Sequence, residues 1–237
     1  MEKNCQPQKM HLQKRTACVR CGKCCTASSP SLLKEDMALF NAGVLSCGNV
    51  VTVREGERVR SHSDGRIYES FMELIKIRCR EGSSVCVFYN NDEGCAIYDN
   101  RPSQCRQYEC WRPVDLYEGL EKNALGRKEV FDGVSALMEV ITSHDEKCSY
   151  KRLSGAFERA AAGDENAVED IIDMLQYDTC LRPFVQEKFN VPGDALDLLL
   201  GRPLADALNE FGFRVVMEGD DYNLLPVEGP AEDKDEQ

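Results

Sequence analysis

Eight cysteines, gathered in two short stretches, constrain this chain more than any other feature. The first stretch holds Cys18, Cys21, Cys24 and Cys25, and the second holds Cys86, Cys95, Cys105 and Cys110. Packing explains clusters of this density poorly, whereas clustered cysteines in a reducing compartment usually indicate metal binding or redox chemistry. The chain has 13 cysteines in all, an odd number, so disulfides within one chain cannot pair every thiol.

Other features of the sequence restrict where the protein is located and what it binds. The N-terminal residues form no apolar signal core, so we expect no secretion signal and a cytoplasmic location, where thiols persist. No stretch approaches the roughly 20 apolar residues of a membrane-spanning helix, so we expect no membrane partner. The net charge of −12 argues against broad non-specific binding of nucleic acids.

The first stretch contains two overlapping C-x-x-C steps. Such a step bends the backbone so that both sulfur atoms face one ion, and Gly22 permits the tight turn. Cys24 and Cys25 are adjacent, and we expect adjacent side chains to point apart, so that the two thiols do not serve one tetrahedral ion together. The first stretch therefore predicts two neighbouring ions or one cluster of several ions.

Together, eight thiols suffice for two Cys₄ zinc sites, two iron–sulfur cubanes or one bridged cluster. Their spacing leaves the pairing of ligands open. Eight thiolates around two zinc ions would keep a charge of about −4, which calls for nearby cations. Basic side chains also lower the pKa of thiols and favour the metal-binding form. The candidates that lie beside the cysteines in sequence are Arg20, Lys23, Arg101, Arg106 and Arg112.

Charge and cysteine content divide the chain into two parts. Residues 1–120 carry a net charge of +2 and 11 cysteines, whereas the remainder carries −14 and only two cysteines. We predict an α+β protein, in which a small irregular cysteine-rich metal-binding domain with short strands is followed by a mainly helical acidic extension. The expected units are a flexible basic arm at 1–17, the metal-binding domain at 18–120, the extension with a terminal hairpin at 121–227, and a disordered acidic tail at 228–237.

Local patterns predict the elements. Strands at 50–53 and 58–60 flank a turn at Gly56, and β-branched and apolar residues predict another strand at 72–77. Turn-forming residues between 86–89 and 95–98 predict a β-hairpin. Apolar residues at helical spacing, together with turn signals, predict the helices. We expect them near 32–42, 102–108, 130–141, 153–161, 168–175, 195–200 and 204–211, followed by a hairpin of 213–217 and 222–227.

Three blocks of sequence carry a resemblance to a known family. They are Cys18-x-x-Cys-Gly-x-Cys-Cys25, Cys86-x-Phe88, and Cys95-x-Ile-Tyr-x-x-Arg-Pro-x-x-Cys-Arg-x-x-x-Cys110. Over about residues 18–112 they resemble the CxxCxxCC family, the YkgJ-like cysteine-cluster proteins, although Val87 stands where the family often has Pro. The resemblance implies chelation of zinc or iron by the eight cysteines and does not fix the metal.

Two other classes remain open. Flagellin lysine N-methylases contain a similar cysteine motif and are associated with iron–sulfur chemistry, so the resemblance also admits an iron–sulfur enzyme of that kind or an electron carrier. No Gly-rich nucleotide loop follows a strand, and the residues provide no independent methyl-donor site. A disulfide-rich interaction module is the third class. The role of the acidic extension, the substrate and the protein partner are not readable from the residues.

The other cysteines and the histidines lack ligand spacing to these eight thiols. We interpret Cys5, Cys47, Cys79, Cys148 and Cys180 as small packing residues. We expect His11, His62 and His144 to be solvated, although His144 lies near Cys148 and is the histidine to test.

Overall fold

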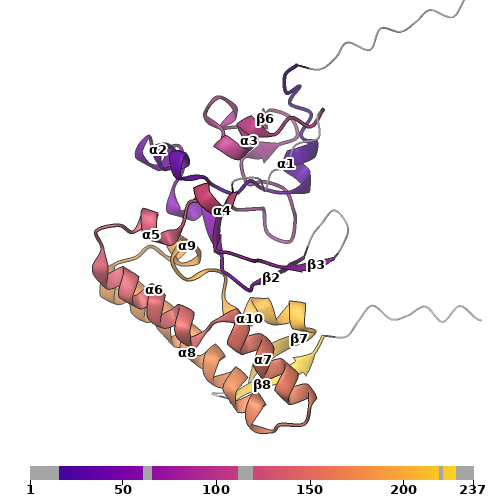
Figure 1. The fold of residues 1–237 in the computed structure, drawn as a ribbon, viewed down its shortest axis with the longest axis vertical. Coiled ribbons are helices and arrows are strands. Elements are labelled where there is room, and N and C mark those ends of the chain that lie inside the picture. Colours follow the sequence, from indigo (N-terminus) through magenta and orange to yellow (C-terminus); the bar gives the residue numbers. More distant parts are fainter. Residues whose placement is uncertain (1–15, 61–65, 112–119, 219–220, 228–237) are drawn as a thin grey trace, which may run out of the picture.

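The computed structural model describes residues 16–60, 66–111, 120–218 and 221–227, and Figure 1 shows the chain. The predicted acidic tail, and the predicted basic arm apart from residues 16 and 17, lie outside the described residues. Helices and short antiparallel strand pairs make up the described fold, which confirms the predicted α+β class. Among the described helices, none combines the length and the apolar character that crossing a membrane requires.

Short elements form the cysteine-rich part, which Figure 1 draws in indigo to magenta. In chain order they are α1 (Lys23–Ala27), η1 (Lys34–Asp36), α2 (Met37–Asn41), η2 (Cys47–Asn49), β1 (Val50–Val53), β2 (Arg58–Arg60), β3 (Ile67–Glu69), β4 (Leu74–Ile77), β5 (Tyr89–Asn90), β6 (Gly94–Cys95), η3 (Tyr98–Asn100) and α3 (Ser103–Gln107). The helix expected near 32–42 is present as the 3-10 turn η1 followed directly by α2.

The two strands around Gly56 do not pair with each other. Instead β1 pairs with β4 and β2 with β3, each antiparallel. In the first pair, Val50 lies opposite Ile77 and Thr52 opposite Ile75, and all four side chains are buried. Alternate residues of a strand share a face, so this pairing collects the buried residues of both strands on one side.

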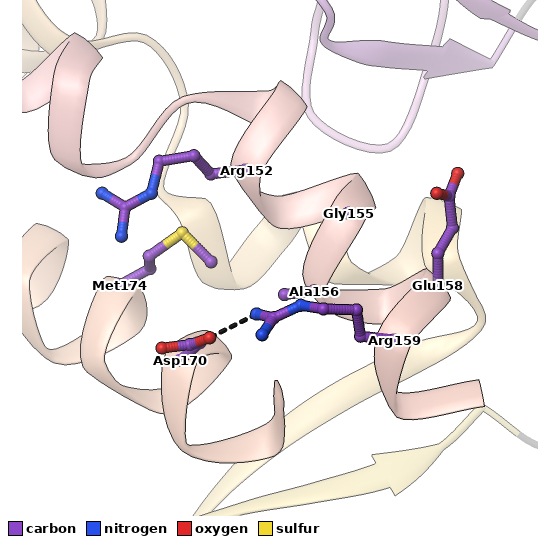
Figure 2. A pocket seen from close by; sticks show the side chains of 7 residues that line it. All are labelled: Arg152, Gly155, Ala156, Glu158, Arg159, Asp170 and Met174. Carbon is purple, nitrogen blue, oxygen red and sulfur yellow. Dashed lines mark hydrogen bonds and ion pairs between the residues drawn. The ribbon is translucent and has the colours of Figure 1, made fainter. Parts of the chain in front are cut away.

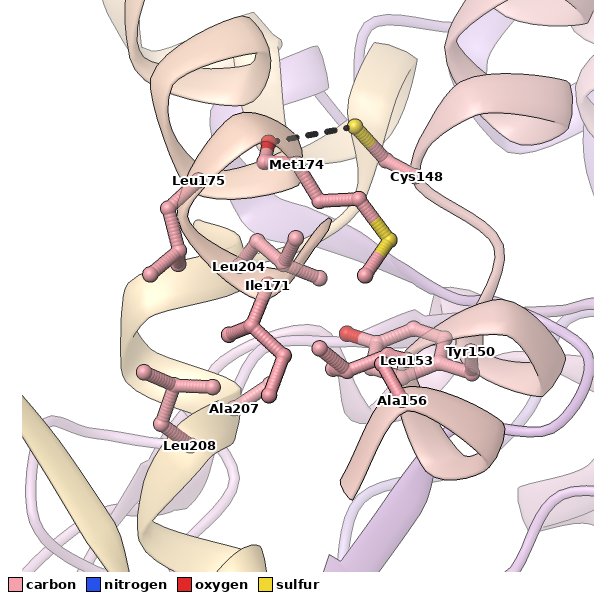
Figure 3. Close-up of a cluster of buried hydrophobic side chains, with 10 residues drawn as sticks. All are labelled: Cys148, Tyr150, Leu153, Ala156, Ile171, Met174, Leu175, Leu204, Ala207 and Leu208. Atoms are coloured by element: carbon pink, nitrogen blue, oxygen red, sulfur yellow. Dashed lines mark hydrogen bonds between the residues drawn. The ribbon is translucent and has the colours of Figure 1, made fainter. Parts of the chain in front are cut away.

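Helices dominate the remainder of the described chain, as predicted. They are α4 (Leu120–Asn123), α5 (Arg127–Val130), α6 (Ser135–Lys147), α7 (Tyr150–Ala161), α8 (Asn166–Phe189), η4 (Gly193–Ala195), α9 (Leu196–Leu200), α10 (Leu204–Ala207) and η5 (Leu208–Phe211), and the expected hairpin follows as β7 (Phe213–Glu218) and β8 (Asp221–Pro226). Side chains of α7, α8, α10 and η5 form a buried apolar cluster, which Figure 3 shows.

The two parts of the chain share a second apolar cluster. Leu32, Ile75 and Ile77 from the cysteine-rich part pack in one buried group with Leu125 and with Leu198 of α9. The buried Thr52 hydroxyl donates a hydrogen bond of 2.6 Å to the carbonyl oxygen of Leu198. The acidic extension therefore completes the core under β1 and β4, and β4 leads along the chain to the second group of cysteines.

Buried charges also join the two parts. Arg127 is 2% exposed and contacts Glu73 and Asp145, with Nη2 2.6 Å from an oxygen of each carboxylate. Arg54, 3% exposed at the end of β1, donates to the carbonyl oxygen of Cys148 at 3.1 Å. Buried charges persist only when they are paired and hydrogen-bonded, so these contacts fix how the extension sits on the strands.

His144 belongs to this buried network, and the expectation that it is solvated is wrong. Its side chain is completely buried in α6, where Nε2 lies 2.8 Å from Oδ1 of Asp178. Burial lowers the pKa of His144, and the nearby Arg54 charge acts in the same direction. The helical pattern of α6 alone did not reveal this, because the partner lies 34 residues later in α8.

Candidate metal centre

The first group of cysteines enters the fold through a glycine turn. Gly22 has φ of 74° and precedes α1, as the sequence predicts for a tight turn within the C-x-x-C steps. A Cβ atom at Gly22 would lie 2.0 Å from the hydroxyl oxygen of Tyr89. Tyr89 sits in β5, so the turn that carries the first cysteines packs directly on the hairpin that carries the second group.

Cys24 and Cys25 point in similar directions, which contradicts the expectation that their side chains diverge. Both lie in α1, and their Sγ atoms are 3.9 Å apart. Successive residues of a helix are rotated by about 100°, whereas those of a strand point to opposite faces. Two thiolates on one tetrahedral zinc ion lie about 3.8 Å apart. The observed separation therefore allows both sulfurs to serve one ion.

A backbone hydrogen bond joins the two groups of cysteines. The N–H of Cys86 donates to the carbonyl oxygen of Cys25 at 2.8 Å. Nearby, the Ser84 hydroxyl donates to the carbonyl oxygen of Thr26. Segments separated by about 60 residues are thus held side by side at the cysteines themselves, as Figure 1 shows for α1, β6 and α3.

Thiols of the two groups lie close enough for the charge of one to alter the pKa of another. A hydrogen bond to Cys24 raises the pKa of Cys25, and burial and the thiolate charges of Cys24, Cys95 and Cys105 add to the effect. The same bond lowers the pKa of Cys24 to about 6. Burial raises the pKa of Cys105 to about 12, and the charges of Cys86, Cys24 and Cys95 contribute. We call Cys24, Cys25, Cys86, Cys95 and Cys105 the inner thiols.

The other three predicted ligands lie at the surface, as does Cys24 among the inner thiols. Cys18, Cys21 and Cys110 are exposed, and the sulfur of Cys18 accepts a 3.4 Å hydrogen bond from the backbone N–H of Arg20. Within the described ranges, no three or more His, Cys, Asp or Glu side chains are arranged so that they could hold a metal ion. The inner thiols therefore lie near one another without forming a ready metal site, and the full set of eight ligands stays a prediction. Cys5, His11, His62 and Arg112 lie outside the described residues.

Lys76 is a cation of this neighbourhood that the sequence analysis missed. Its Nζ donates to the carbonyl oxygen of Ser29 at 2.8 Å. Burial lowers the pKa of Lys76, and the charges of Cys79 and Cys105 act against that change. Lys76 lies between Ile75 and Ile77 in β4, and both neighbours are buried on the opposite face. Strand alternation was the signal that could have placed it.

The cations expected from sequence have mixed roles. The charge of Arg101 lowers the pKa of Cys105, against the larger effect of burial. The guanidinium carbons of Arg20 and Arg101 lie 3.7 and 4.1 Å from the ring centroid of Tyr98. Arg106 donates to the carbonyl oxygen of Arg101 and to the Ser103 hydroxyl, which holds α3 in place. Arg101 is thus the predicted cation that acts on an inner thiol.

A groove of about 440 Å³ lies between α7 and α8, and Figure 2 shows the side chains that line it. The lining residues come later in the sequence than all eight clustered cysteines. Its two arginines and Asp170 already have partners. Arg159 pairs with Asp164 and Asp170, and Arg152 donates to the carbonyl oxygens of Glu146 and Lys147. None of the eight cysteines lines it. We therefore assign the groove no part in the metal centre.

Comparison with known families gives one match. The sequence model of the CxxCxxCC family, described as "Putative zinc- or iron-chelating domain", matches residues 17–148, more than half of the chain. The chain belongs to the CxxCxxCC family. The CxxCxxCC match extends beyond residue 112, where the sequence analysis placed its end, and runs through α6 to Cys148. Comparisons with curated proteins and with solved structures found no match.

Proposed function

We propose that this CxxCxxCC protein is a cytoplasmic metal-binding protein that holds zinc or iron through its eight clustered cysteines, in a structural or carrier role. The observation that supports it most is the convergence of the inner thiols. They come from two segments joined by the Cys86 to Cys25 hydrogen bond of 2.8 Å. The family description supports zinc or iron chelation in general.

The donor chemistry of these cysteines suits such an ion. Thiolates are soft ligands that suit zinc and iron. The 3.9 Å between Cys24 and Cys25 matches two ligands of one tetrahedral site. Cys86, Cys95 and Cys105 offer further donors, since charge interactions link them to Cys24 and Cys25 across the two groups. Cys18, Cys21 and Cys110 would complete the set from exposed positions close in sequence to the inner thiols. When bound, the metal would supply folding free energy to a part of the chain built from short elements.

Two basic side chains are candidates to balance the negative charge of the metal-bound thiolates. Thiolates around an ion keep an excess of negative charge, which needs donors or cations nearby. Lys76 is positioned to provide one positive charge, because the charges of Cys79 and Cys105 both act on it. Arg101 provides a second near Cys105. We propose that these two side chains, rather than Lys23 or Arg106, balance the inner thiolates.

The test is metal analysis of the full chain purified without oxygen. We expect zinc or iron at a fixed ratio to protein, and a loss of at least half of it in a Cys24→Ser plus Cys105→Ser variant. Cys180→Ser is the matched control, since Cys180 is an exposed thiol of α8 outside both groups. It should keep the wild-type metal content.

Acid-labile sulfide measured on the same sample separates the alternatives. Iron without sulfide, or zinc, supports simple chelation. Iron with a stoichiometric amount of sulfide and a brown colour would replace this proposal with an iron–sulfur enzyme or an electron carrier. A preparation with no bound metal that also takes up none on reconstitution would contradict metal binding altogether.

A further inference from the structure

Cys79 lies opposite Cys86, although the sequence analysis treated it as a packing residue. The two residues form an isolated antiparallel bridge. Two hydrogen bonds flank the pair, from the N–H of Arg80 to the carbonyl oxygen of Val85 at 2.7 Å and from the N–H of Val87 to that of Arg78 at 3.0 Å. This pattern defines a non-hydrogen-bonded pair, in which the Cα atoms are about 4.5 Å apart.

That arrangement meets the requirements of a disulfide. Residues directly opposite each other in an antiparallel pair place their side chains on the same face. A disulfide needs Cα atoms roughly 4.4–6.8 Å apart, and the Cys79 and Cys86 pairing falls within this range. Both residues are free thiols, with Cys79 partly exposed and Cys86 buried. An oxidant can therefore reach Cys79 first.

The other close pair of thiols fits less well. Cys24 and Cys25 have Sγ atoms 3.9 Å apart, but they are neighbours in the chain. Their Cα atoms are therefore about 3.8 Å apart across one trans peptide bond, below the usual disulfide range. Oxidation of the metal-free cluster should consequently favour the cross-strand pair over the adjacent pair.

We propose that Cys79 and Cys86 form a reversible disulfide that withdraws Cys86 from the metal centre. The oxidant is a small disulfide such as oxidised glutathione. The Cys79 thiolate attacks one glutathione sulfur, which gives a mixed disulfide and releases one reduced glutathione. The Cys86 thiolate then attacks the sulfur of Cys79 and releases the second. Two protein thiols are oxidised, one glutathione disulfide is reduced, and the two thiol protons pass to the departing glutathione thiolates.

The consequence for the metal rests on the proposed function, in which Cys86 is a ligand. A sulfur held in a disulfide is no longer an anionic thiolate, and the thiolate is the form that binds metal. Oxidation would therefore lower the affinity for the ion, and a bound ion would protect Cys86 from oxidation. Formation of the disulfide in the metal-free chain does not depend on that assignment.

Peptide mapping of the full chain tests both statements. Metal-free and zinc-loaded protein are each treated with oxidised glutathione under anaerobic conditions, alkylated and digested. Cleavage after Arg80 and after Glu93 places Cys79, Cys86 and Cys95 on three separate peptides. We expect a linked Cys79–Cys86 peptide from the metal-free protein, its loss on treatment with dithiothreitol, and little of it from the zinc-loaded protein.

Two single variants provide matched controls. Cys79→Ser should abolish the linked peptide and make zinc retention insensitive to oxidised glutathione. Cys47→Ser should change neither result, because Cys47 is also a partly exposed thiol outside the eight. Because the wild-type map is itself a readout, a variant that folds poorly does not remove the test.

The outcomes separate this proposal from the proposed function. Linkage of Cys86 to Cys95, or no linkage of Cys86 in the metal-free chain, would overturn the disulfide. Equal linkage with and without bound zinc would overturn the competition for Cys86. A chain that binds no zinc yet forms the Cys79–Cys86 linkage would overturn the proposed function and support the disulfide alone.

Discussion

Nε2 of His144 lies 2.8 Å from Oδ1 of Asp178, and both side chains are buried between α6 and α8. Arg182 donates to both carboxylate oxygens of Asp178 at 3.1 Å, and the backbone N–H of Leu204 donates to Oδ2 at 2.9 Å. The carboxylate is thus held by three elements of the helical part. On its other side, Nδ1 of His144 lies 3.4 Å from Nη1 of Arg54, which belongs to the cysteine-rich part.

Asp178→Asn should destabilise the fold by about 3 kcal/mol, because removal of one partner leaves buried charge uncompensated. Urea unfolding at pH 7 measures the free energy of unfolding. Glu169→Gln is the control on the same helix, since Glu169 is exposed, and it should change stability by no more than about 0.5 kcal/mol. Similar values for the two variants would contradict the buried role of Asp178.

Acid should weaken the fold through Asp178. Burial alone would raise the pKa of its carboxyl, but the hydrogen bond from His144 and the charge and hydrogen bonds of Arg182 outweigh burial and lower the pKa to about 2. A depressed pKa contributes stability above the unfolded pKa of about 3.9, and that contribution is lost as the pH falls through the folded value.

We therefore expect the unfolding free energy of the wild type to fall by about 2 kcal/mol more than that of Asp178→Asn between pH 5 and pH 2. Urea titrations at several pH values in this window give the difference. Parallel curves for the two proteins would show that Asp178 does not carry this pH dependence.

Gly22→Ala should damage the junction of the two cysteine groups. A left-handed backbone costs a non-glycine residue about 1–2 kcal/mol. The added Cβ would also lie 2.0 Å from the Tyr89 hydroxyl oxygen, so Tyr89 must move. Gly43→Ala is the matched control, because Gly43 has φ of 70° and a Cβ added there would meet no atom within 4 Å.

Both variants should be less stable than the wild type, because alanine is strained in a left-handed backbone. Gly22→Ala should be destabilised further by the contact of its Cβ with Tyr89. Thermal unfolding of the metal-loaded protein measures the stability, and a competitive chelator titration measures the metal affinity. We expect weakened metal binding for Gly22→Ala alone. Equal effects of the two substitutions on affinity would mean that the contact with Tyr89 is irrelevant to the site.

Removal of the metal should loosen the cysteine-rich part and spare the helices. Elements of two to five residues cannot sustain themselves, and binding energy at a thiolate site is folding energy. In hydrogen exchange, the amide of Cys86 that donates to Cys25 should lose protection after chelation, whereas the amide of Leu153 in α7 should keep it. A Cys24→Ser plus Cys105→Ser variant should behave like the stripped protein. Unchanged exchange at Cys86 would argue against metal-dependent folding.

The pattern of the residues was sufficient for the general organisation. The helical period after residue 130 predicts a helical extension, and the turn residues before 222 predict its closing hairpin, because both patterns act through neighbours in the chain. The turn at Gly22 was predicted for the same reason, since only local backbone geometry is involved. Helix α8 runs further than its apolar repeat indicates, and Val185 in its C-terminal half packs in one buried cluster with residues of α6 and α9.

Local sequence patterns could not predict contacts between residues that are distant in the chain. The pairing of β1 with β4, the buried position of His144 and the place of Lys76 beside the thiols each depend on partners from elsewhere in the chain. The expectation that Cys24 and Cys25 point apart was wrong because both lie in the helical turn α1, where adjacent side chains are rotated by about 100° and are not opposed. In each case several arrangements satisfy the local pattern, and burial selects one of them.

By itself, the sequence determined which residues offer metal-binding chemistry, because thiols at short spacings are a property of the covalent chain. It also determined the family, since the CxxCxxCC match rests on residue identities. Only the tertiary structure decided that Cys25 meets Cys86, that Cys79 lies opposite Cys86, and that the extension completes the core under β1 and β4. Those contacts follow from burying apolar surface and pairing buried polar groups across the whole chain, which no local pattern encodes.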